Sequence, residues 1–550
     1  MRILAISPAH DSSICVFNNG ELEFFCKEER LSRKKRDKHP MLSLELYRSL
    51  SKGRIDHALW VAPGNDEPIA FDFHYSYCKK ILGVELENFS SLQHHLCHAS
   101  LAFYNSGFKE ALVFVIDRNG SMFFINDTPV ARESESVFVG YADGIMPIHK
   151  SFWLYEGYEN KKHEIRNIIH NHYEKRCSVS AVNSMSIVKV YEAATTLIGQ
   201  DNLENGKTMG LAAYGADQNY EPLFINGMPI NEYFIHINRV TCFHGYDDKI
   251  TLNVTPQNMS MYANKAKHVQ LETQRVALEL ISEWVNKTHI KNVCVVGGYG
   301  LNVVANQHYL KHMPNVNFYF EPVADDTGTP IGACMIKHKW LTGKTPTGLK
   351  HNFYHYYDAD ADKYLPSSET KTASVEEVCE LLIQQKTVAI FDGAPEAGPR
   401  ALGHRSILFD SRNPKAKELV NKVKRREWYR PFAGVVLKSE FNKYFETLGL
   451  EEAPFMTINF ECKDITKRTS PGIVHADGSC RVQTVADGFL HELLSLFYEK
   501  TGCPLLLNTS FNLAGEALVQ TKQDALNTFL NSKLDAVYFV NEKFLIVKED

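Results

Sequence analysis

The chain has 550 residues, of which 44% are hydrophobic and 23% charged, and its formal net charge at pH 7 is −5. This length exceeds what one hydrophobic core supports, so two or three domains are expected. The charge balance gives no electrostatic reason to bind nucleic acid or an anionic membrane, and no apolar run approaches the roughly 20 residues of a membrane span. The twelve cysteines form no C-x-x-C pair. With no recognisable signal peptide, this pattern predicts free thiols and a cytoplasmic protein.

The first elements are short strands, expected at residues 2–7, 13–17 and 22–26. Asn19-Gly20 lies between the last two, and Asn-Gly is the strongest short signal for a hairpin. A buried strand over residues 111–116 ends at Asp117, and a glycine turn and a returning strand over residues 122–125 follow it. The two stretches share a layout, a strand that ends in a turn with Asp and then a returning strand. Such a duplication is typical of an actin-like fold.

A histidine-rich segment reads His94-His95-Leu96-Cys97-His98. In a helix, residues i and i+4 lie on one face about 5–6 Å apart at Cβ, so His94 and His98 can bind one ion. Neutral imidazole is the commonest metal ligand, and Asp117 at a strand end is placed to complete the site. The sequence therefore indicates half of a metal site, with an ordinary polar helix face as the alternative.

A helix is expected from about residue 267 to 286, followed by a β-branched strand over residues 292–297. This strand runs into Gly297-Gly298-Tyr299-Gly300-Leu301-Asn302. Glycines at such a junction let the backbone approach a ligand closely, although a plain tight turn is an equal alternative. The next strand, residues 317–320, leads to Asp325-Asp326, an acidic pair available as the last metal ligand.

Periodicity is lost over residues 343–372, which marks a domain boundary, and a second α/β unit opens with a helix over 373–385 and a strand over 387–391. This domain concentrates cations in a Gly- and Arg-bearing loop, residues 393–406, and in the basic, aromatic-laced run 422–430. Arg offers a planar fork that matches phosphate oxygens, and Lys offers a point charge. The pattern favours a polyphosphate or acyl-phosphate ligand. The alternatives for the run 422–430 are a solvated helix face and RNA binding, and the overall acidity disfavours the latter.

Together, the motifs resemble the O-carbamoyltransferases of the NodU/TobZ type, and the likeness runs nearly end to end. In the first part the motifs are His10-Asp11, the EERLSR segment from Glu28, the HHLCHA segment from His94, Gly206-Lys207, MGLAAYG from Met209, and Gly297-Gly298 through Asn302. In the second part they are GPRALGHRS from Gly398, REWYRPFA from Arg426, HADGSCRVQTV from His475, LNTSFN from Leu507, and Gly515-Glu516.

The resemblance implies an α/β protein with two linked domains. Residues 1–350 would form a duplicated actin-like (ASKHA) domain similar to the tRNA threonylcarbamoyl transferases, and residues 351–550 a YrdC-like domain. The second domain would convert carbamoyl phosphate and ATP, with Mg²⁺, to carbamoyl-adenylate. The first would pass the carbamoyl group to the hydroxyl of a small acceptor such as a sugar, a natural product or a hydroxymethyl nucleotide.

The resemblance also assigns residues. A divalent metal, expected to be Fe²⁺ with Zn²⁺ or Mn²⁺ as alternatives, would lie on His94, His98, Asp117 and Asp326, with Asp325 next in line. His10, with Asp11, would take the proton of the acceptor hydroxyl, unless it is only a turn residue that contacts Asp11. Carbamoyl phosphate and ATP would be held by Arg400, Lys424, Arg430, Arg481, Asn508 and Asn512. The nucleotide or intermediate in the first domain would contact Lys207, Gly210, Gly297, Gly298 and Asn302.

The chain departs from the family pattern beside the first carboxylate. It reads Asp117-Arg118-Asn119-Gly120, where the family usually has Asp-Gly-x-Gly, so the acceptor pocket is expected to be unusual. His404 stands where Asn is more frequent. Two other hypotheses are a tRNA threonylcarbamoyl-type enzyme, which calls for a basic surface that the net charge does not support, and a non-catalytic nucleotide-binding actin-like protein, which needs neither the four metal ligands nor the arginine-rich second domain.

Overall fold

The computed structural model describes the chain except for residues 9, 63–67, 90–92, 156, 183–185, 231–232, 238–239, 244–253, 256, 350–352, 360–361, 363–370 and 549–550. The chain forms two compact units. Unit 1 comprises Met1–Glu28 and Lys38–Asn352, and unit 2 comprises Glu29–Asp37 and Phe353–Asp550. The boundary expected at residues 350 and 351 lies outside the described residues. That residues 29–37 group with unit 2 was not expected from the sequence, which placed them in the first domain.

The first sheet of unit 1 has the strand order β3-β2-β1-β4-β5. Its strands are β1 (Arg2–Ser7), β2 (Ser13–Asn18), β3 (Glu21–Lys27), β4 (His57–Trp60) and β5 (Leu86–Asn88). β2 is antiparallel to both β1 and β3, whereas β4 is parallel to both β1 and β5. The Asn-Gly hairpin is confirmed, because Asn19 (φ 52°) and Gly20 (φ 89°) both take the left-handed conformation that this turn requires.

The second sheet of unit 1 repeats this plan in the order β10-β9-β8-β6-β15-β16, with β7 paired to β8. Its strands are β6 (Ala111–Ile116), β7 (Met122–Ile125), β8 (Thr128–Tyr141), β9 (Gly144–Leu154), β10 (Ser178–Val182), β15 (Asn292–Val296) and β16 (Asn317–Phe320). β8 is antiparallel to β6 and β9, and β15 is parallel to β6 and β16. β9-β8-β6-β15-β16 therefore has the same order and strand directions as β3-β2-β1-β4-β5. The duplication that the sequence suggested weakly is plain in the topology.

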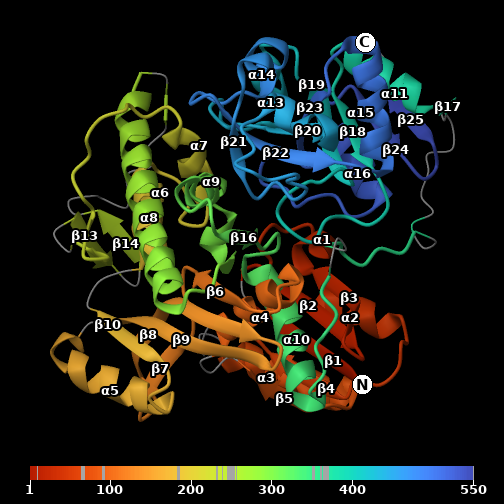
Figure 1. Cartoon of the computed structure of the whole chain (residues 1–550). Helices are drawn as coiled ribbons and strands as arrows, with labels where there is room; N and C mark the ends of the chain where they lie inside the picture. Colours follow the sequence, from red (N-terminus) through yellow and green to blue (C-terminus); the bar gives the residue numbers. More distant parts are fainter. Residues whose placement is uncertain are drawn as a thin grey trace. The chain divides into compact units, whose positions relative to one another are not determined.

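Helices of unit 1 connect and flank these sheets (Figure 1). They are α2 (Met41–Ser49), α3 (Pro68–Tyr77), α4 (His94–Ser106), α5 (Lys162–His172), α6 (Ile187–Leu197), α7 (Asn205–Ala212), α8 (Met259–Thr288), α9 (Val303–His312) and α10 (Thr329–Thr342), with short β-hairpins β11–β12 (Phe224–Ile225 and Met228–Pro229) and β13–β14 (Phe234–Ile237 and Val240–Phe243). α8 extends beyond the helix expected over residues 267–286. In the described part of the chain, no helix combines the length and the apolar character needed to cross a membrane.

Unit 2 is built on one mixed sheet in the order β17-β25-β24-β18-β19-β23-β20-β22-β21. Its strands are β17 (Lys371–Thr372), β18 (Val388–Phe391), β19 (Arg405–Asp410), β20 (Ala433–Leu437), β21 (Asn459–Glu461), β22 (Ser479–Val485), β23 (Leu505–Ser510), β24 (Ala536–Phe539) and β25 (Phe544–Val547). The helices are α1 (Glu28–Ser32), α11 (Val375–Ile383), α12 (Ala416–Lys424), α13 (Phe441–Tyr444), α14 (Asp464–Thr469), α15 (Gly488–Thr501) and α16 (Lys522–Leu530). The first residue of α1, Glu28, is the last residue of the first segment of unit 1, and the rest of the helix belongs to unit 2. The α/β fold class is thus confirmed for both units.

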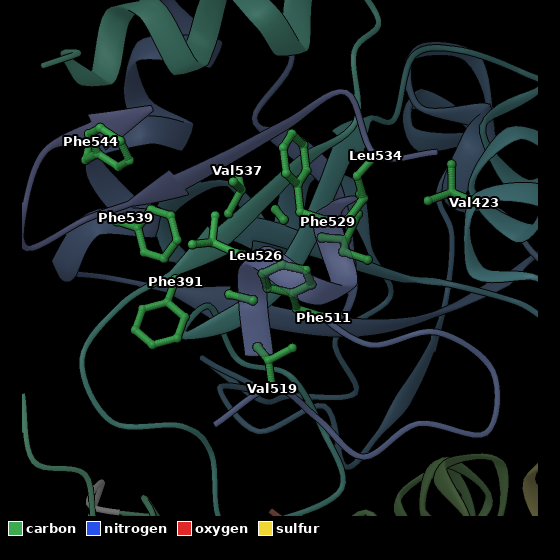
Figure 2. Close-up of a cluster of buried hydrophobic side chains, with 13 residues drawn as sticks. Phe391, Val423, Phe511, Val519, Leu526, Phe529, Leu534, Val537, Phe539 and Phe544 are labelled. Carbon is green, nitrogen blue, oxygen red and sulfur yellow. The ribbon is translucent and has the colours of Figure 1, made fainter. Parts of the chain in front are cut away.

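A cluster of buried apolar side chains packs one end of the unit 2 sheet (Figure 2). Phe391 of β18 and Phe539 of β24 lie with Leu526 and Phe529 of α16, which shows that this helix is held by its apolar face. Burial of such side chains contributes about 1.5–3 kcal/mol each. The cluster includes Ile407 of β19 and Phe511, which directly follows β23, and so it packs against the strands that carry the polar residues described below.

Candidate metal centre and cationic cluster

The predicted histidine pair lies on one face of α4, at its N-terminal end. His94 and His98 are both fully buried, and the centroids of their rings are 4.8 Å apart. α4 packs against β6 and β15 of the second sheet and against α10. The spacing of four residues and the burial of this face by neighbouring elements therefore fix the two imidazoles side by side, as the sequence predicted.

Two carboxylates converge on these histidines. Asp117 directly follows β6, and Asp326 begins the short 3₁₀ turn Asp326–Gly328 before α10. The Nε2 atoms of His94 and His98 lie 3.4 and 3.3 Å from Oδ1 of Asp326, and Nε2 of His94 is 3.8 Å from Oδ2 of Asp117. One ligand atom from each of the four residues lies within 4.8 Å of the others. We call this set the His/Asp group.

The His/Asp group is chemically suited to a divalent transition metal. Among the described residues, neither ring nitrogen of His94 or His98 has a hydrogen-bond partner, although both rings are fully buried. Buried polar atoms are rarely left without a partner, so orphaned imidazole nitrogens facing two carboxylates indicate a site for a bound ion. Burial opposes the charged form of His94, but Asp326 and Asp117 raise its pKa to about 10. The site thus has a strong negative potential, which would attract a cation.

The predicted base His10 lies next to the His/Asp group. Its Nδ1 is 4.0 Å from Oδ2 of Asp326, and its Nε2 is 3.3 Å from Oδ2 of Asp11. Lys27 of β3 donates a 2.7 Å hydrogen bond to Oδ1 of Asp11. Burial would raise the pKa of Asp11, but Lys27 and His10 hold it below its usual value. Lys27 was not among the predicted residues.

The glycines after β15 support a carboxylate of the His/Asp group. The Gly298 N–H donates a 2.7 Å hydrogen bond to Oδ1 of Asp117. Gly297 has φ 91°, and a Cβ there would lie 2.5 Å from the Ile116 carbonyl oxygen. The close approach seen here is to the end of β6 and not to a ligand, and it orients Asp117. A contact of these glycines with nucleotide stays a prediction.

The other predicted residues of unit 1 have structural partners. Asn302 caps α9, since its Oδ1 accepts from the Ala305 N–H, and its amide also bonds to Gln270. Lys207 of α7 is paired with Glu204 and Gln200. Gly210 is buried in the same helix. Their predicted role in ligand binding is not tested by these contacts.

A buried polar network, which the sequence did not reveal, lies behind the His/Asp group. His95 hydrogen bonds through Nδ1 to Ser136 (2.8 Å), which donates to Glu133 (3.0 Å), and Lys150 also donates to Glu133. Burial is the main reason that the pKa of His95 falls to about 3, so the ring is neutral. The available signal was the run Arg132-Glu133-Ser134-Glu135-Ser136, which puts consecutive polar residues inside a buried strand.

In unit 2 the strand register places two of the predicted residues on one face of the sheet. Arg481 of β22 and Asn508 of β23 are both paired with Ala433 of β20. Residues directly across from one another point to the same face. Gln483, two residues after Arg481, accepts a 2.8 Å hydrogen bond from Asn508 and donates one of 2.7 Å to the Leu402 carbonyl. The Gly- and Arg-bearing loop therefore lies over this face.

Lys424 is a buried cation with neutral partners. It ends α12 with its side chain almost fully buried, and its ammonium donates to the carbonyl and hydroxyl of Ser510 and to Oδ1 of Asn512. No carboxylate in the described part of the chain is within ion-pair distance of it. Burial, with Arg426 and Arg430 nearby, holds the pKa of Lys424 well below its usual value.

Lys424 belongs to a set of five basic residues that we call the cationic cluster: Arg400, Lys424, Arg426, Arg430 and Arg481. Burial lowers the pKa of Arg481, and Arg400, Arg426 and Arg430 lower it further. Within the described residues, the buried Nε of Arg481 and Oδ1 of Asn508 have no hydrogen-bond partner. Clustered cations that lower one another's pKa, together with the unpartnered Nε of Arg481, favour the binding of an anion here. Arg426 was not among the predicted residues.

Two further residues, missed by the sequence analysis, shape the loop of residues 393–406. Glu396 accepts hydrogen bonds through Oε1 from the backbone N–H groups of Leu402 and His404. The guanidinium of Arg405, which is fully buried, donates to four backbone carbonyls and lies 3.4 Å from the ring centroid of Phe391. Both residues therefore hold the loop in place over the sheet.

Comparison with known proteins identifies the family. A family model described as the carbamoyltransferase N-terminus matches residues 54–335, and one described as the carbamoyltransferase C-terminus matches residues 379–548. The chain therefore belongs to the carbamoyltransferase family and is a transferase enzyme. This confirms the family and the enzyme class expected from the sequence.

Curated relatives agree over most of the chain. Nodulation protein NolNO of Sinorhizobium fredii is 26% identical over 572 residues, covering 96% of this chain and 78% of the relative. The uncharacterized protein MJ1058 of Methanocaldococcus jannaschii is 29% identical over 491 residues, covering 84% of this chain and 74% of that protein. Nodulation protein U of Sinorhizobium fredii is 33% identical over 228 residues, covering 41% of this chain and 40% of the relative.

Proposed function

We propose that this enzyme is an ATP-dependent O-carbamoyltransferase that forms carbamoyl-adenylate in unit 2 and transfers its carbamoyl group to an alcohol in unit 1. The duplicated sheets of unit 1 support an actin-like fold, with its ligand site at the strand ends that carry Asp117 and the His/Asp group. Unit 2 is assigned a YrdC-like fold on the resemblance of its motifs. The observation that carries the proposal is the cationic cluster, in which Lys424 is buried and the four arginines are partly exposed, because a triphosphate and an acyl phosphate need many cations in one place.

The first step fits the chemistry of unit 2. Water cleaves carbamoyl phosphate to carbamate and phosphate, and a carbamate oxygen then attacks the α-phosphorus of ATP, so that pyrophosphate leaves and carbamoyl-adenylate forms. Lys424 and Arg481 would bind the phosphoryl oxygens, on which negative charge develops. Asn508 offers an amide oxygen without a partner among the described residues, which suits the carbamoyl N–H₂ group.

The second step fits the His/Asp group. His94, His98, Asp117 and Asp326 would hold a divalent metal, which when bound supplies positive charge beside the carbamoyl and phosphate oxygens. Oδ2 of Asp11, 3.3 Å from Nε2 of His10, would orient the imidazole so that Nδ1 could take the proton of the acceptor hydroxyl. The acceptor oxygen then forms its bond to the carbamoyl carbon, and AMP leaves.

Pyrophosphate exchange tests the first step without knowledge of the acceptor. The purified chain is incubated with ATP, Mg²⁺ and labelled pyrophosphate, with and without carbamoyl phosphate. We expect label to enter ATP only when carbamoyl phosphate is present, since reversal of adenylate formation is the route of entry. Exchange that is independent of carbamoyl phosphate, or no exchange in folded protein, would contradict the adenylate mechanism.

His10→Ala tests the proposed base. We expect carbamoyl transfer, followed as AMP release with an acceptor, to fall by about 100- to 10,000-fold while pyrophosphate exchange is unchanged. Added imidazole should partly restore the variant. A variant with full transfer activity, or one in which exchange falls equally, would exclude this role.

A further inference from the structure

Arg118 stands directly after a carboxylate of the His/Asp group and is held by a buried partner. Its Nε and Nη2 donate to the two oxygens of Glu192, at 3.1 and 2.7 Å, in a bidentate pair. Glu192 lies on α6 with 0% of its side chain exposed, whereas 27% of the Arg118 side chain is exposed. The guanidinium is therefore fixed on one edge and open on another. Within the described residues, its Nη1 has no hydrogen-bond partner.

The charges around Arg118 do not balance. Lys189, one helical turn before Glu192 on α6, also donates to Glu192, at 2.9 Å. Two cations thus share one carboxylate. Burial lowers the pKa of Lys189 to about 8, so the ammonium is still mostly charged at neutral pH. Asp117 and Asp326 lie within Coulombic range of Arg118, but a divalent ion on the His/Asp group would balance those two carboxylates. One positive charge then remains uncompensated.

We propose that Arg118 is an oxyanion-binding residue of the transfer site, which takes a phosphate or carboxylate group of a ligand placed at the metal centre. Glu192 and Lys189 are its positioning residues. The inference rests on the proposed function, since it requires a ligand at the His/Asp group. Two ligands there can supply the oxyanion. One is the phosphate of carbamoyl-adenylate, and the other is an acidic group on the acceptor, which would make the acceptor a phosphorylated or carboxylated alcohol.

The pairing geometry supports binding rather than a purely structural role. Glu192 does not need the Arg118 guanidinium for charge neutralisation, because the buried ammonium of Lys189 already pairs with it. A guanidinium fixed by a bidentate pair loses little freedom when its remaining N–H groups bind an oxyanion. The partly exposed side chain lets a ligand reach it, while its position next to Asp117 keeps that ligand at the reacting centre.

Phosphate binding to the full-length protein tests the proposal. Inorganic phosphate is titrated by calorimetry into Arg118→Gln and into the matched control Arg176→Gln, an exposed arginine of unit 1 paired with Glu174. Binding to unit 2 is common to both variants, so a difference reports Arg118. We expect Arg118→Gln to lose one class of phosphate site or to bind it at least about tenfold more weakly. Arg118→Lys should be intermediate.

Glu192→Gln adds a second test, in which no loss of phosphate binding is expected. It keeps an acceptor for Arg118 but removes the negative charge, so phosphate should bind no more weakly than to the Arg176→Gln control. A merely structural Arg118–Glu192 pair predicts instead that both variants lose thermal stability and that neither changes phosphate binding. Equal phosphate and AMP binding in Arg118→Gln and Arg176→Gln would overturn the proposal.

AMP and adenosine distinguish the two sources. If Arg118→Gln weakens AMP but not adenosine, the oxyanion is the donor phosphate. If it weakens inorganic phosphate and leaves AMP unchanged, the oxyanion belongs to the acceptor, and glucose 6-phosphate is a better first acceptor probe than glucose. Pyrophosphate exchange on the same preparations reports the proposed function separately. Its absence in every variant would contradict adenylate formation, whereas the phosphate titration decides the role of Arg118.

Discussion

Lys424→Met is expected to lower carbamoyl-phosphate-dependent pyrophosphate exchange by on the order of 100- to 1,000-fold without destabilising the protein. The ammonium is buried against neutral acceptors, Ser510 and Asn512, and Arg426 and Arg430 repel it. Such a charge is unfavourable for folding in the absence of an anion, so replacing it by an apolar chain of similar length costs little stability. Its loss does remove a cation that would face the phosphoryl groups. The measurements are exchange rate and thermal unfolding midpoint.

Lys422→Met is the matched control. Lys422 lies on the same helix, α12, with 67% of its side chain exposed, and pairs with Glu418. Exposed pairs of this kind contribute little to stability, so neither exchange nor stability should change measurably. Phosphate and pyrophosphate should raise the unfolding midpoint of the wild type and of Lys422→Met, and much less that of Lys424→Met. Full exchange activity in Lys424→Met would remove Lys424 from the anion site.

The contrast between these two lysines shows what the sequence could not decide. The run from Lys422 to Arg430 was open to three interpretations, a phosphate site, a solvated helix face and RNA binding, and its two lysines of α12 differ in environment. Lys422 faces solvent, whereas Lys424 is buried where α12 ends, because Arg425 then turns the chain with φ 52°. Composition and local pattern do not reveal which face of a short helix a neighbouring strand will cover.

Local spacing was enough for one half of the His/Asp group. His94 and His98 were predicted from the geometry of a single helix, and that geometry is confirmed. The approach of Asp326 to Asp117 depends instead on β15, which lies between β6 and β16 in the sheet. Strand ends far apart in the sequence are brought together only by that pairing. Asp326, rather than Asp325, was assigned by the family resemblance, and the structure places its carboxylate against both histidines.

The segment of residues 29–37 shows the same limit for domain organisation. The sequence placed it in the first domain, yet Arg30 is buried and donates to the Glu396 carbonyl of unit 2, and Arg33 donates to the carbonyl oxygens of Ala517 and Leu518. Arg33 also pairs with Asp524, 3.4 Å away, a partner far along the chain that no local pattern indicates. Such contacts follow from the tertiary fold alone.

His98→Ala is expected to abolish tight metal binding and carbamoyl transfer while it leaves pyrophosphate exchange intact. It removes one of four donors from a buried site, and a water molecule would have to replace the lost imidazole beside His94, Asp117 and Asp326. We expect metal affinity to fall by more than the roughly 10- to 100-fold that loss of an outer-shell partner costs. The measurements are metal content after dialysis, transfer as AMP release, and exchange on the same preparation.

Cys97→Ala is the control for disturbance of α4, because Cys97 is equally buried in the same helical turn and does not belong to the His/Asp group. It should retain metal and transfer activity. The separation of the two activities in His98→Ala follows from the placement of the cationic cluster in unit 2 and the His/Asp group in unit 1. If His98→Ala kept its metal, the ligand assignment would be wrong. If it lost exchange together with transfer, the metal would serve adenylate formation as well. The assignment of adenylate formation to unit 2 and of transfer to unit 1 would then be wrong.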